Sequence, residues 1–181
     1  MGEADFPDIE SVAVAVDYCH RCGTAVEQRE LEGRAVDWCD ECEHHLSRIP
    51  VPAVHVVVHD DEQVLVLDEP IPQHEGLWSL PGGFAGHDES PRRAGLRELE
   101  EETGLRADPA DLRFVTIQHV ELDGIAFYLV SYAVDRANVS GDVTPEAPGF
   151  EVHFRPTDEV LSAEDRIRET DCERIRLAVE R

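Results

Sequence analysis

The chain has 181 residues, of which 40 are acidic and 16 basic, so its formal net charge at pH 7 is −24. Its length allows one main domain with a sizeable core plus a small module. The charge argues against long-range attraction to nucleic acid. The apolar runs are too short to cross a bilayer and the acidic N-terminus lacks a signal-peptide core, so we expect a cytoplasmic protein without a membrane partner.

All sixteen basic residues are arginine, and this composition resembles that of proteins from salt-accumulating halophiles. In molar salt the Debye length is only about 3 Å, so the charges are screened from one another. In dilute buffer the same charges destabilise the compact state. We therefore predict that folding or activity is lost below about 0.5 M salt. Thermal melting across a salt series measures this, and an equal melting temperature in salt-free buffer would contradict it.

Two Cys-x-x-Cys pairs mark the N-terminal part of the chain. The first is Cys19 and Cys22, and the second is Cys39 and Cys42. This spacing is typical of a four-cysteine zinc ribbon, in which Zn–S ligation contributes on the order of 10–16 kcal/mol to folding. Disulfides are disfavoured in a cytoplasm, and a redox Cys-x-x-Cys needs no second pair. We expect a ribbon at about 17–46 whose zinc is structural, because four thiolates fill its coordination positions.

Segment 49–52 contains two prolines and indicates a stiff connector, so we place the domain boundary there. The predicted domains are an N-terminal segment, 1–50, and a main domain, 51–181. Between residues 17 and 48 there are eight acids against four arginines, so the ribbon lacks the basic footprint of a nucleic-acid reader. The sequence leaves open a role of the ribbon in forming a homodimer.

The main domain mixes strand and helix patterns. Strands are predicted at 53–59, 63–67, 77–80, 114–122, 125–134 and 150–154, and helices at 91–103 and 163–179. Turns or loops are predicted at 60–62, 68–76, 123–124 and 135–149. Cys172, the remaining cysteine, has no partner at ligand spacing and is expected simply to lie on the second helix.

The first helix has clear ends, because Ser90 can cap it, Pro91 suits its first position and Gly104 suits the position after its end. Glu98, Glu101 and Glu102 fall on one face, at i, i+3 and i+4. The opposite face carries Leu96, Leu99 and Thr103, which can pack against a core. On the carboxylate side, one turn earlier, Ala94 and Gly95 are expected to leave room for a bulky ligand.

Such close carboxylates repel one another by roughly 0.2–0.5 kcal/mol per helix pair. A hard divalent cation, Mg²⁺ or Mn²⁺, removes that repulsion, although a solvated acidic face is the alternative. Before the helix comes Leu-Pro-Gly-Gly-Phe at 80–84. Gly82 and Gly83 permit a tight turn that brings the main chain close to a phosphate or metal, although Pro-Gly-Gly is also an ordinary turn.

The segment 83–105 holds a longer pattern. It reads Gly83, five residues, Glu89, seven residues, Arg-Glu-Leu at 97–99, one residue, Glu-Glu at 101–102, one residue and Gly-Leu at 104–105. At every defined position it resembles the G-x5-E-x7-R-E-U-x-E-E-x-G-U box of the Nudix hydrolases, where U is a bulky aliphatic residue. The resemblance, over about 51–181, implies an α+β fold: an α/β/α sandwich with a mixed sheet, preceded here by the small ribbon.

The family resemblance also implies an activity and roles for particular residues. Nudix enzymes hydrolyse a nucleoside diphosphate linked to another moiety. Glu98 and Glu102 would be the principal Mg²⁺ (or Mn²⁺) ligands, with the Gly82 carbonyl completing part of the coordination sphere. Glu101 would be a further ligand or a base that orients water. Arg97 would hold the glutamates in place with Glu89 as its partner, or serve only as a salt-bridge donor.

Other residues could contact the nucleotide derivative. An acid outside the box often joins such sites, and Glu146 and Glu151 are the candidates here. The main chain of Gly83 could approach a phosphate. The rings that could stack on or contact a base are those of Trp78, Phe84, His74 and His119. Each of these has the alternative of being an ordinary surface, core or rim residue.

A zinc ribbon before a Nudix domain also resembles the NADH pyrophosphatases, but their Ser-Gln-Pro-Trp motif is absent from 105–122. ADP-ribose, another dinucleotide or a nucleoside triphosphate is therefore equally open as substrate. The alternative function is a non-catalytic regulator that senses a nucleotide while its ribbon binds nucleic acid or a protein. Such relatives usually have eroded box glutamates, and here all of them are present.

Overall fold

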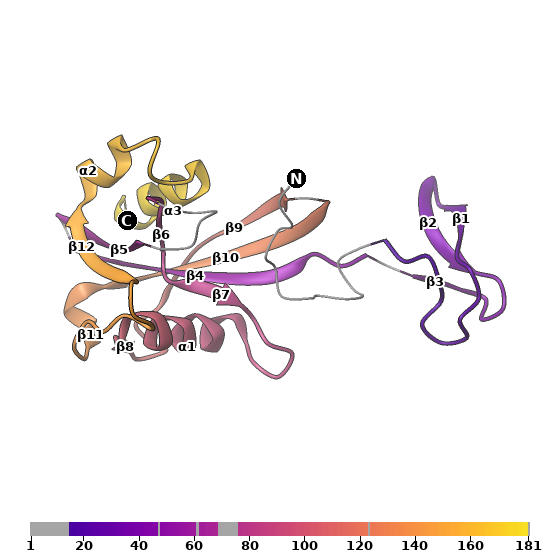
Figure 1. Cartoon of the computed structure of the whole chain (residues 1–181), viewed down its shortest axis with the longest axis horizontal. Coiled ribbons are helices and arrows are strands. Elements are labelled where there is room, and N and C mark those ends of the chain that lie inside the picture. The colour runs from indigo at the N-terminus through magenta and orange to yellow at the C-terminus, as the bar shows by residue number, and fades with distance from the viewer. Residues whose placement is uncertain (1–14, 47, 61, 69–75, 123, 181) are drawn as a thin grey trace. The chain divides into compact units, whose positions relative to one another are not determined.

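The computed structural model describes residues 15–46, 48–60, 62–68, 76–122 and 124–180 (Figure 1). The predicted His74 and most of the loop 68–76 therefore lie outside the described residues. The chain divides into two compact units, 1–51 with 119–127, and 52–118 with 128–181.

The small N-terminal module contains a three-stranded antiparallel sheet of β1 (Glu27–Leu31), β2 (Arg34–Cys39) and β3 (His44–Leu46). Glu32 and Gly33 link the first two strands with φ values of 52° and 79°, as the commonest tight hairpin turn requires. Between residues 15 and 46 only Cys19 and Cys39 are buried. The module therefore lacks an apolar core, and four gathered cysteines take its place.

The main domain is built on a seven-stranded sheet with the order β12-β5-β4-β10-β9, in which β6 pairs with β5 and β7 pairs with β4. The strands are β4 (Val51–His59), β5 (Gln63–Asp68), β6 (Trp78–Ser79), β7 (Gly82–Phe84), β9 (Arg113–Leu122), β10 (Ile125–Asp135) and β12 (Glu151–Pro156). A separate pair joins β8 (Arg106–Ala107) to β11 (Val139–Ser140).

Helices cover both faces of this sheet: α1 (Pro91–Thr103) lies on one side, and α2 (Thr157–Ser162) and α3 (Glu169–Val179) lie on the other (Figure 1). Successive residues of β4 point to opposite faces. Val56 joins the core cluster that includes Leu99 of α1, and Val57 joins the cluster that includes Ile175 of α3. The predicted α+β fold, a mixed sheet between helices, is confirmed. Among the described helices, none combines the length and apolar character that a membrane crossing needs.

Several element predictions are wrong in detail. The strand β4 begins at Val51, inside the predicted connector. Residues 82–84 of the predicted turn 80–84 form instead the strand β7, because its glycines let it lie directly beside β4. The loop 135–149 contains the 3₁₀ helix η1 (Arg136–Asn138) and β11.

The predicted helix 163–179 is shorter than expected and begins at Glu169. The segment before it pairs with the sheet, since the Trp78 N–H donates to the Arg166 carbonyl at 2.6 Å and Ile167 forms a parallel bridge with Trp78. These backbone contacts to β6 override the helical preference of the sequence. Cys172 lies on α3 and is buried, as expected.

Candidate functional site

The helix α1 forms where the sequence predicts it. The Ser90 side chain accepts a hydrogen bond from the Arg93 N–H at 3.4 Å, and Pro91 occupies the first turn. At the other end Gly104 has a φ of 74° and its N–H donates to the Glu100 carbonyl at 2.9 Å. These two caps satisfy backbone groups at the helix ends and set where the helix begins and ends.

One face of α1 is buried against the sheet. Leu99 and Thr103 are fully buried, as predicted. Ala94 and Gly95 are buried as well, and a Cβ added to Gly95 would lie 3.1 Å from Cγ2 of Val56. The prediction that Ala94 and Gly95 leave room for a ligand is therefore wrong, because their small size instead lets the helix pack closely on β4.

Arg97 lies at the centre of the carboxylates on the other face. Its Nη1 donates to Glu98 at 2.7 Å and to Glu101 at 2.9 Å. Its Nη2 donates to Glu89 at 2.8 Å and to the backbone carbonyl of Phe84 at 3.0 Å. One guanidinium thus ties α1 to the segment that precedes it, and it partly neutralises three carboxylates that would otherwise repel one another.

The glycines of β7 bring backbone next to the remaining carboxylates. The Gly82 N–H donates to Oε2 of Glu102 at 2.8 Å. A Cβ built on Gly83 would lie only 2.6 Å from Cδ and Oε1 of Glu98, so glycine is needed for this close approach. The structure therefore brings together the predicted Gly82, Gly83, Glu98 and Glu102.

Burial and charge act differently on the individual acids. Burial raises the pKa of Glu98, and the neighbouring Arg97 opposes that rise. Hydrogen bonds from Arg97 and from the Gly86 N–H hold the pKa of Glu89 below its usual range. The same carboxylates raise the pKa of Arg97, which therefore stays charged. The side chain of Glu101 is half exposed, at 52%.

The donor set of this cluster suits a hard divalent cation, because all its candidate ligand atoms are oxygens of carboxylates or of the main chain. Glu98 is only 14% exposed and sits against Gly83, and a half-buried carboxylate of this kind favours a compensating positive charge. Sequence reasoning missed Gly86, whose N–H donates to Glu89 at 2.8 Å, and the Phe84 carbonyl. Both act through backbone atoms, which residue identity does not reveal.

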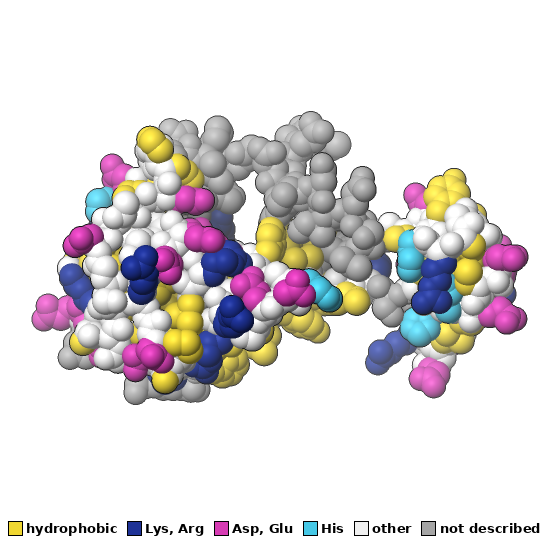
Figure 2. All heavy atoms as spheres, turned by 90° about the horizontal axis from the view of Figure 1, so that it is seen from below, with side chains coloured by type: hydrophobic (Ala, Val, Ile, Leu, Met, Phe, Trp, Pro, Cys, Tyr) yellow, Lys and Arg dark blue, Asp and Glu magenta, His cyan; other side chains and the backbone are white. Residues whose placement is uncertain are grey.

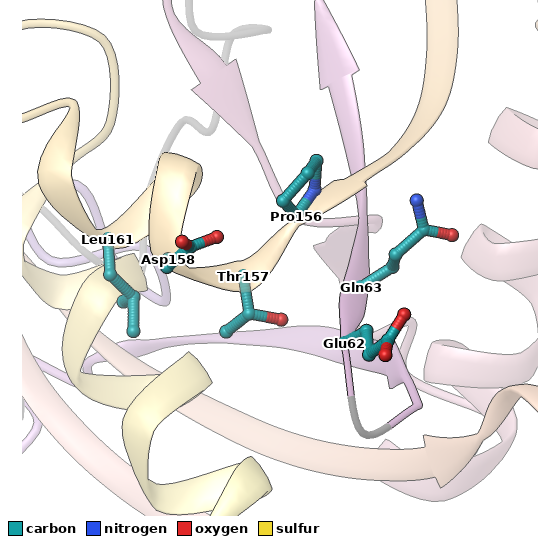
Figure 3. Close-up of a pocket in the computed structure, with 6 residues that line it drawn as sticks. All are labelled: Glu62, Gln63, Pro156, Thr157, Asp158 and Leu161. Carbon is teal, nitrogen blue, oxygen red and sulfur yellow. The ribbon is translucent and has the colours of Figure 1, made fainter.

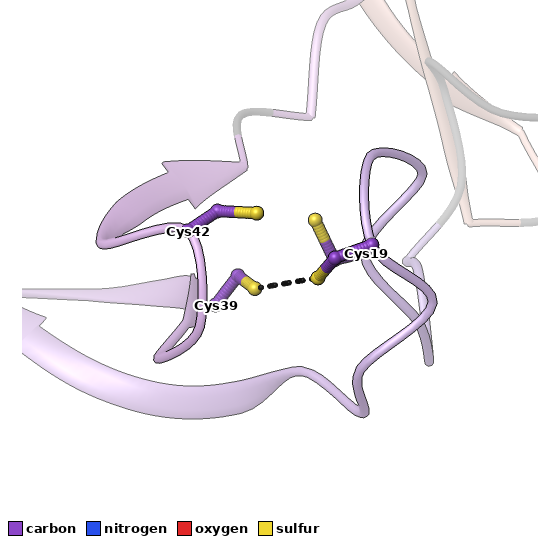
Figure 4. A group of neighbouring side chains, drawn as sticks. Cys19, Cys39 and Cys42 are labelled. Atoms are coloured by element: carbon purple, nitrogen blue, oxygen red, sulfur yellow. Dashed lines mark hydrogen bonds between the residues drawn. The ribbon is translucent and has the colours of Figure 1, made fainter.

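The four predicted cysteines also come together, with all their sulfur atoms within 4.8 Å of one another (Figure 4). All of them are free thiols. Four sulfurs bound tetrahedrally to zinc at about 2.3 Å would lie about 3.8 Å apart, and Sγ of Cys22 and Cys39 are 3.5 Å apart. Hydrogen bonds with Thr24 lower the pKa of Cys22 to about 6, whereas burial raises that of Cys39 and the hydrogen bond with Cys22 raises that of Cys42 to about 12. The cluster fits a structural zinc ion.

The substrate contacts predicted outside the box include Trp78, which the structure does not support. Trp78 is 2% exposed, and the guanidinium groups of Arg155 and Arg166 lie 4.5 Å and 4.2 Å from the centre of its ring. Its prediction as a base-stacking residue is wrong, because the ring is buried within the domain.

Glu146 and Glu151 are exposed, and within the described part of the chain neither is hydrogen-bonded to α1. Glu151 contacts His153 at 2.9 Å. Phe84 is half-buried, and His119 is exposed on β9.

A cavity of about 590 Å³ lies elsewhere in the main domain (Figure 3). It is lined by Glu62, Gln63, Pro156, Thr157, Asp158 and Leu161. None of these belongs to the box, so the carboxylate cluster does not open into this cavity. Figure 2 views the molecule from the α1 side and shows acidic and arginine side chains intermingled on the surface there.

Known proteins resemble this chain over a segment that includes the carboxylate cluster. The sequence matches the NUDIX domain over residues 49–173. The putative ADP-ribose pyrophosphatase YjhB of Bacillus subtilis (strain 168) is 36% identical over 72 residues, which are 39% of this chain and 33% of that protein. The ADP-sugar pyrophosphatase of Mus musculus is 28% identical over 122 residues, 65% of this chain and 56% of that protein. The chain thus spans only a third to just over half of the length of these relatives.

A solved structure shows the same fold. The crystal structure of a NUDIX hydrolase from Nitrosomonas europaea aligns with a TM-score of 0.61 at 20% identity, covering 91% of this chain and 91% of that one. The matched segment includes α1, β7 and the whole seven-stranded sheet, and the chain therefore belongs to the NUDIX domain family.

Proposed function

We propose that the protein is a Mg²⁺- or Mn²⁺-dependent hydrolase that cleaves the pyrophosphate of a nucleoside diphosphate derivative. The observation that carries this proposal is the gathering of Glu98, Glu101 and Glu102 around Arg97 and the Gly82–Gly83 backbone. Relatives are named for ADP-ribose, for ADP-sugar and for CTP, so both an ADP-linked sugar and a nucleoside triphosphate are candidate substrates.

Glu98, Glu102 and the Gly82 carbonyl would hold the cation, with Glu101 as a further ligand or as the base. When bound, the cation supplies neutralisation of the pyrophosphate oxygens and a lowered pKa of a water molecule. Arg97 keeps the acids on one face of α1 by its hydrogen bonds to Glu98 and Glu101.

If Glu101 acts as the base, it would accept the proton of the attacking water. Its carboxylate is half exposed and is held by Arg97 through a single hydrogen bond, so one of its oxygens remains accessible. Water attacks phosphorus, the bridging P–O bond breaks and the leaving phosphate departs with that oxygen. The two products each end in a phosphate group.

The four-cysteine cluster would take a zinc ion with a structural role. Its ligands already number four, which leaves no open position for substrate. The ribbon is thus assigned to stability, and the reaction to the main domain.

A panel of nucleotide derivatives tests the proposal: ADP-ribose, ADP-glucose, NADH and CTP, in high salt with Mg²⁺. Wild type is compared with Glu101→Gln, and ¹⁸O-labelled water identifies the phosphorus that is attacked. Turnover of any of these compounds that falls at least about 100-fold in the variant supports the proposal. Tight nucleotide binding without turnover of any compound would instead identify a nucleotide-sensing regulator.

Replacing Gly83 by alanine should separate stability from activity. The added Cβ would displace the Glu98 carboxylate, which is the flexible end of a side chain, so the free energy of unfolding should change by less than about 1 kcal/mol. Turnover should fall about 10- to 100-fold, since a small misplacement of a ligand weakens catalysis. Thermal melting and turnover measured on one sample check this, and unchanged turnover would contradict it.

A further inference from the structure

A histidine of β4 covers the glycine that donates to Glu102. His55 and Gly82 are direct partners in the antiparallel pairing of β4 with β7. A Cβ built on Gly82 would lie 2.8 Å from Cδ2 and 2.9 Å from Cα of His55. It would also lie 2.2 Å from the Val54 carbonyl oxygen. The imidazole edge therefore lies directly over the Gly82 α-carbon and leaves it little freedom to move.

The His55 ring is uncharged at physiological pH. Burial, together with the positive charges of Arg174 and Arg168, lowers its pKa to about 3. Its Nδ1 is buried and, within the described part of the chain, has no hydrogen-bond partner. A buried nitrogen without a partner is costly, so a ring retained in this place calls for an explanation beyond simple packing.

A buried ion pair of α3 lies on the face of the sheet to which His55 points, because His55 shares that face with Val57, which is in one core cluster with Ile175 of α3. Arg174 and Asp171 are each only 2% exposed and are hydrogen-bonded to each other. The Nε of Arg174 also donates to Oε1 of Gln118 on β9 at 2.6 Å. The Arg174–Asp171 pair lies within α3, and the hydrogen bond from Arg174 to Gln118 ties this helix to β9.

We propose that His55 is a positioning residue: its flat ring fills the space over Gly82 and thereby keeps the Gly82 N–H on the Glu102 carboxylate. The contacts run from β4 through β7 to α1. The catalytic importance of this arrangement rests on the proposed function, in which Glu102 is a ligand of the cation.

The test uses two measurements that need no substrate. Hydrogen exchange of the Gly82 amide is followed by NMR in the metal-free full chain, and Mn²⁺ binding is followed by electron paramagnetic resonance. In His55→Ala we expect the Gly82 amide to exchange roughly tenfold faster and the Mn²⁺ dissociation constant to rise roughly tenfold. His55→Phe keeps a flat, uncharged ring and should restore both values to within about twofold of wild type.

His59→Ala is the matched control, since His59 lies on the same strand but pairs with Val64 rather than with β7. It should leave both measurements unchanged. If His55→Ala does not fold, His55→Leu replaces it, because leucine keeps the buried volume without a flat ring. We expect the same increases in Gly82 amide exchange and in the Mn²⁺ dissociation constant for this variant. Unchanged Gly82 exchange in the folded variant, or an equal effect of His59→Ala, would overturn the proposal. An inactive wild type would refute the proposed function alone, because neither measurement depends on turnover.

Discussion

Glu98→Gln should reduce turnover of the nucleoside diphosphate derivative at least about 100-fold, the largest effect we expect from a single side chain of α1. Glutamine has nearly the same shape but no charge, so it cannot serve as an anionic ligand. Of the three carboxylates that form ion pairs with Arg97, that of Glu98 has the smallest exposed fraction, and it lies against Gly83. Steady-state kinetics at saturating Mg²⁺ measures the effect.

Glu100→Gln is the matched control for this prediction. Glu100 belongs to the same helix, but it is exposed and its carboxylate accepts from Arg106 at 2.8 Å on another face. We expect the turnover of the Glu100→Gln variant to stay within about twofold of wild type, because an exposed ion pair contributes little to stability. Equal losses in the two variants would indicate a general effect of charge on α1 and would contradict the assignment of Glu98.

Removal of zinc should unfold the small module, since metal ligation supplies on the order of 10–16 kcal/mol to such ribbons. Between residues 15 and 46 the only buried residues are two of the cysteines, so no apolar core can substitute. Cys39→Ser, or treatment with a chelator, should abolish hydrogen-exchange protection of β1 and β2. The main domain has its own two core clusters and should keep its protection.

Cys172→Ser tests the specificity of that prediction. This thiol is buried on α3, where burial raises its pKa, and it is not part of the four-cysteine cluster. The variant should retain one zinc per chain by elemental analysis. Less than one equivalent of zinc in wild-type protein purified without chelator would contradict the assignment of the ribbon.

The sequence predicts α1 well because its signals are local. The Ser90 cap, the Pro91 start and the Gly104 end are each set by neighbouring residues, and all three appear in the structure. The strands β5, β9 and β10 follow their apolar patterns for the same reason. The box spacing on a regular helix then brings its carboxylates to one face without any information about the rest of the fold.

The remaining differences come from tertiary contacts. A glycine pair reads as a turn, but Gly82 and Gly83 pair with β4 because only residues without side chains fit between that strand and Glu98. Trp78 suits an aromatic platform, but its ring is covered by two arginines that lie more than 70 residues further along the chain. Gly95 reads as space for a ligand and instead admits Val56. Each outcome depends on a distant partner that no local pattern contains.

A crystal structure with Mg²⁺ and a slowly hydrolysed ADP-ribose analogue tests the central claim most directly. We predict a cation bound by Glu98 and Glu102 together with the Gly82 carbonyl, and a diphosphate bound to that cation. Glu98 and Glu102 directed into solvent, with the nucleotide bound elsewhere and no cation between them, would contradict the assigned chemistry.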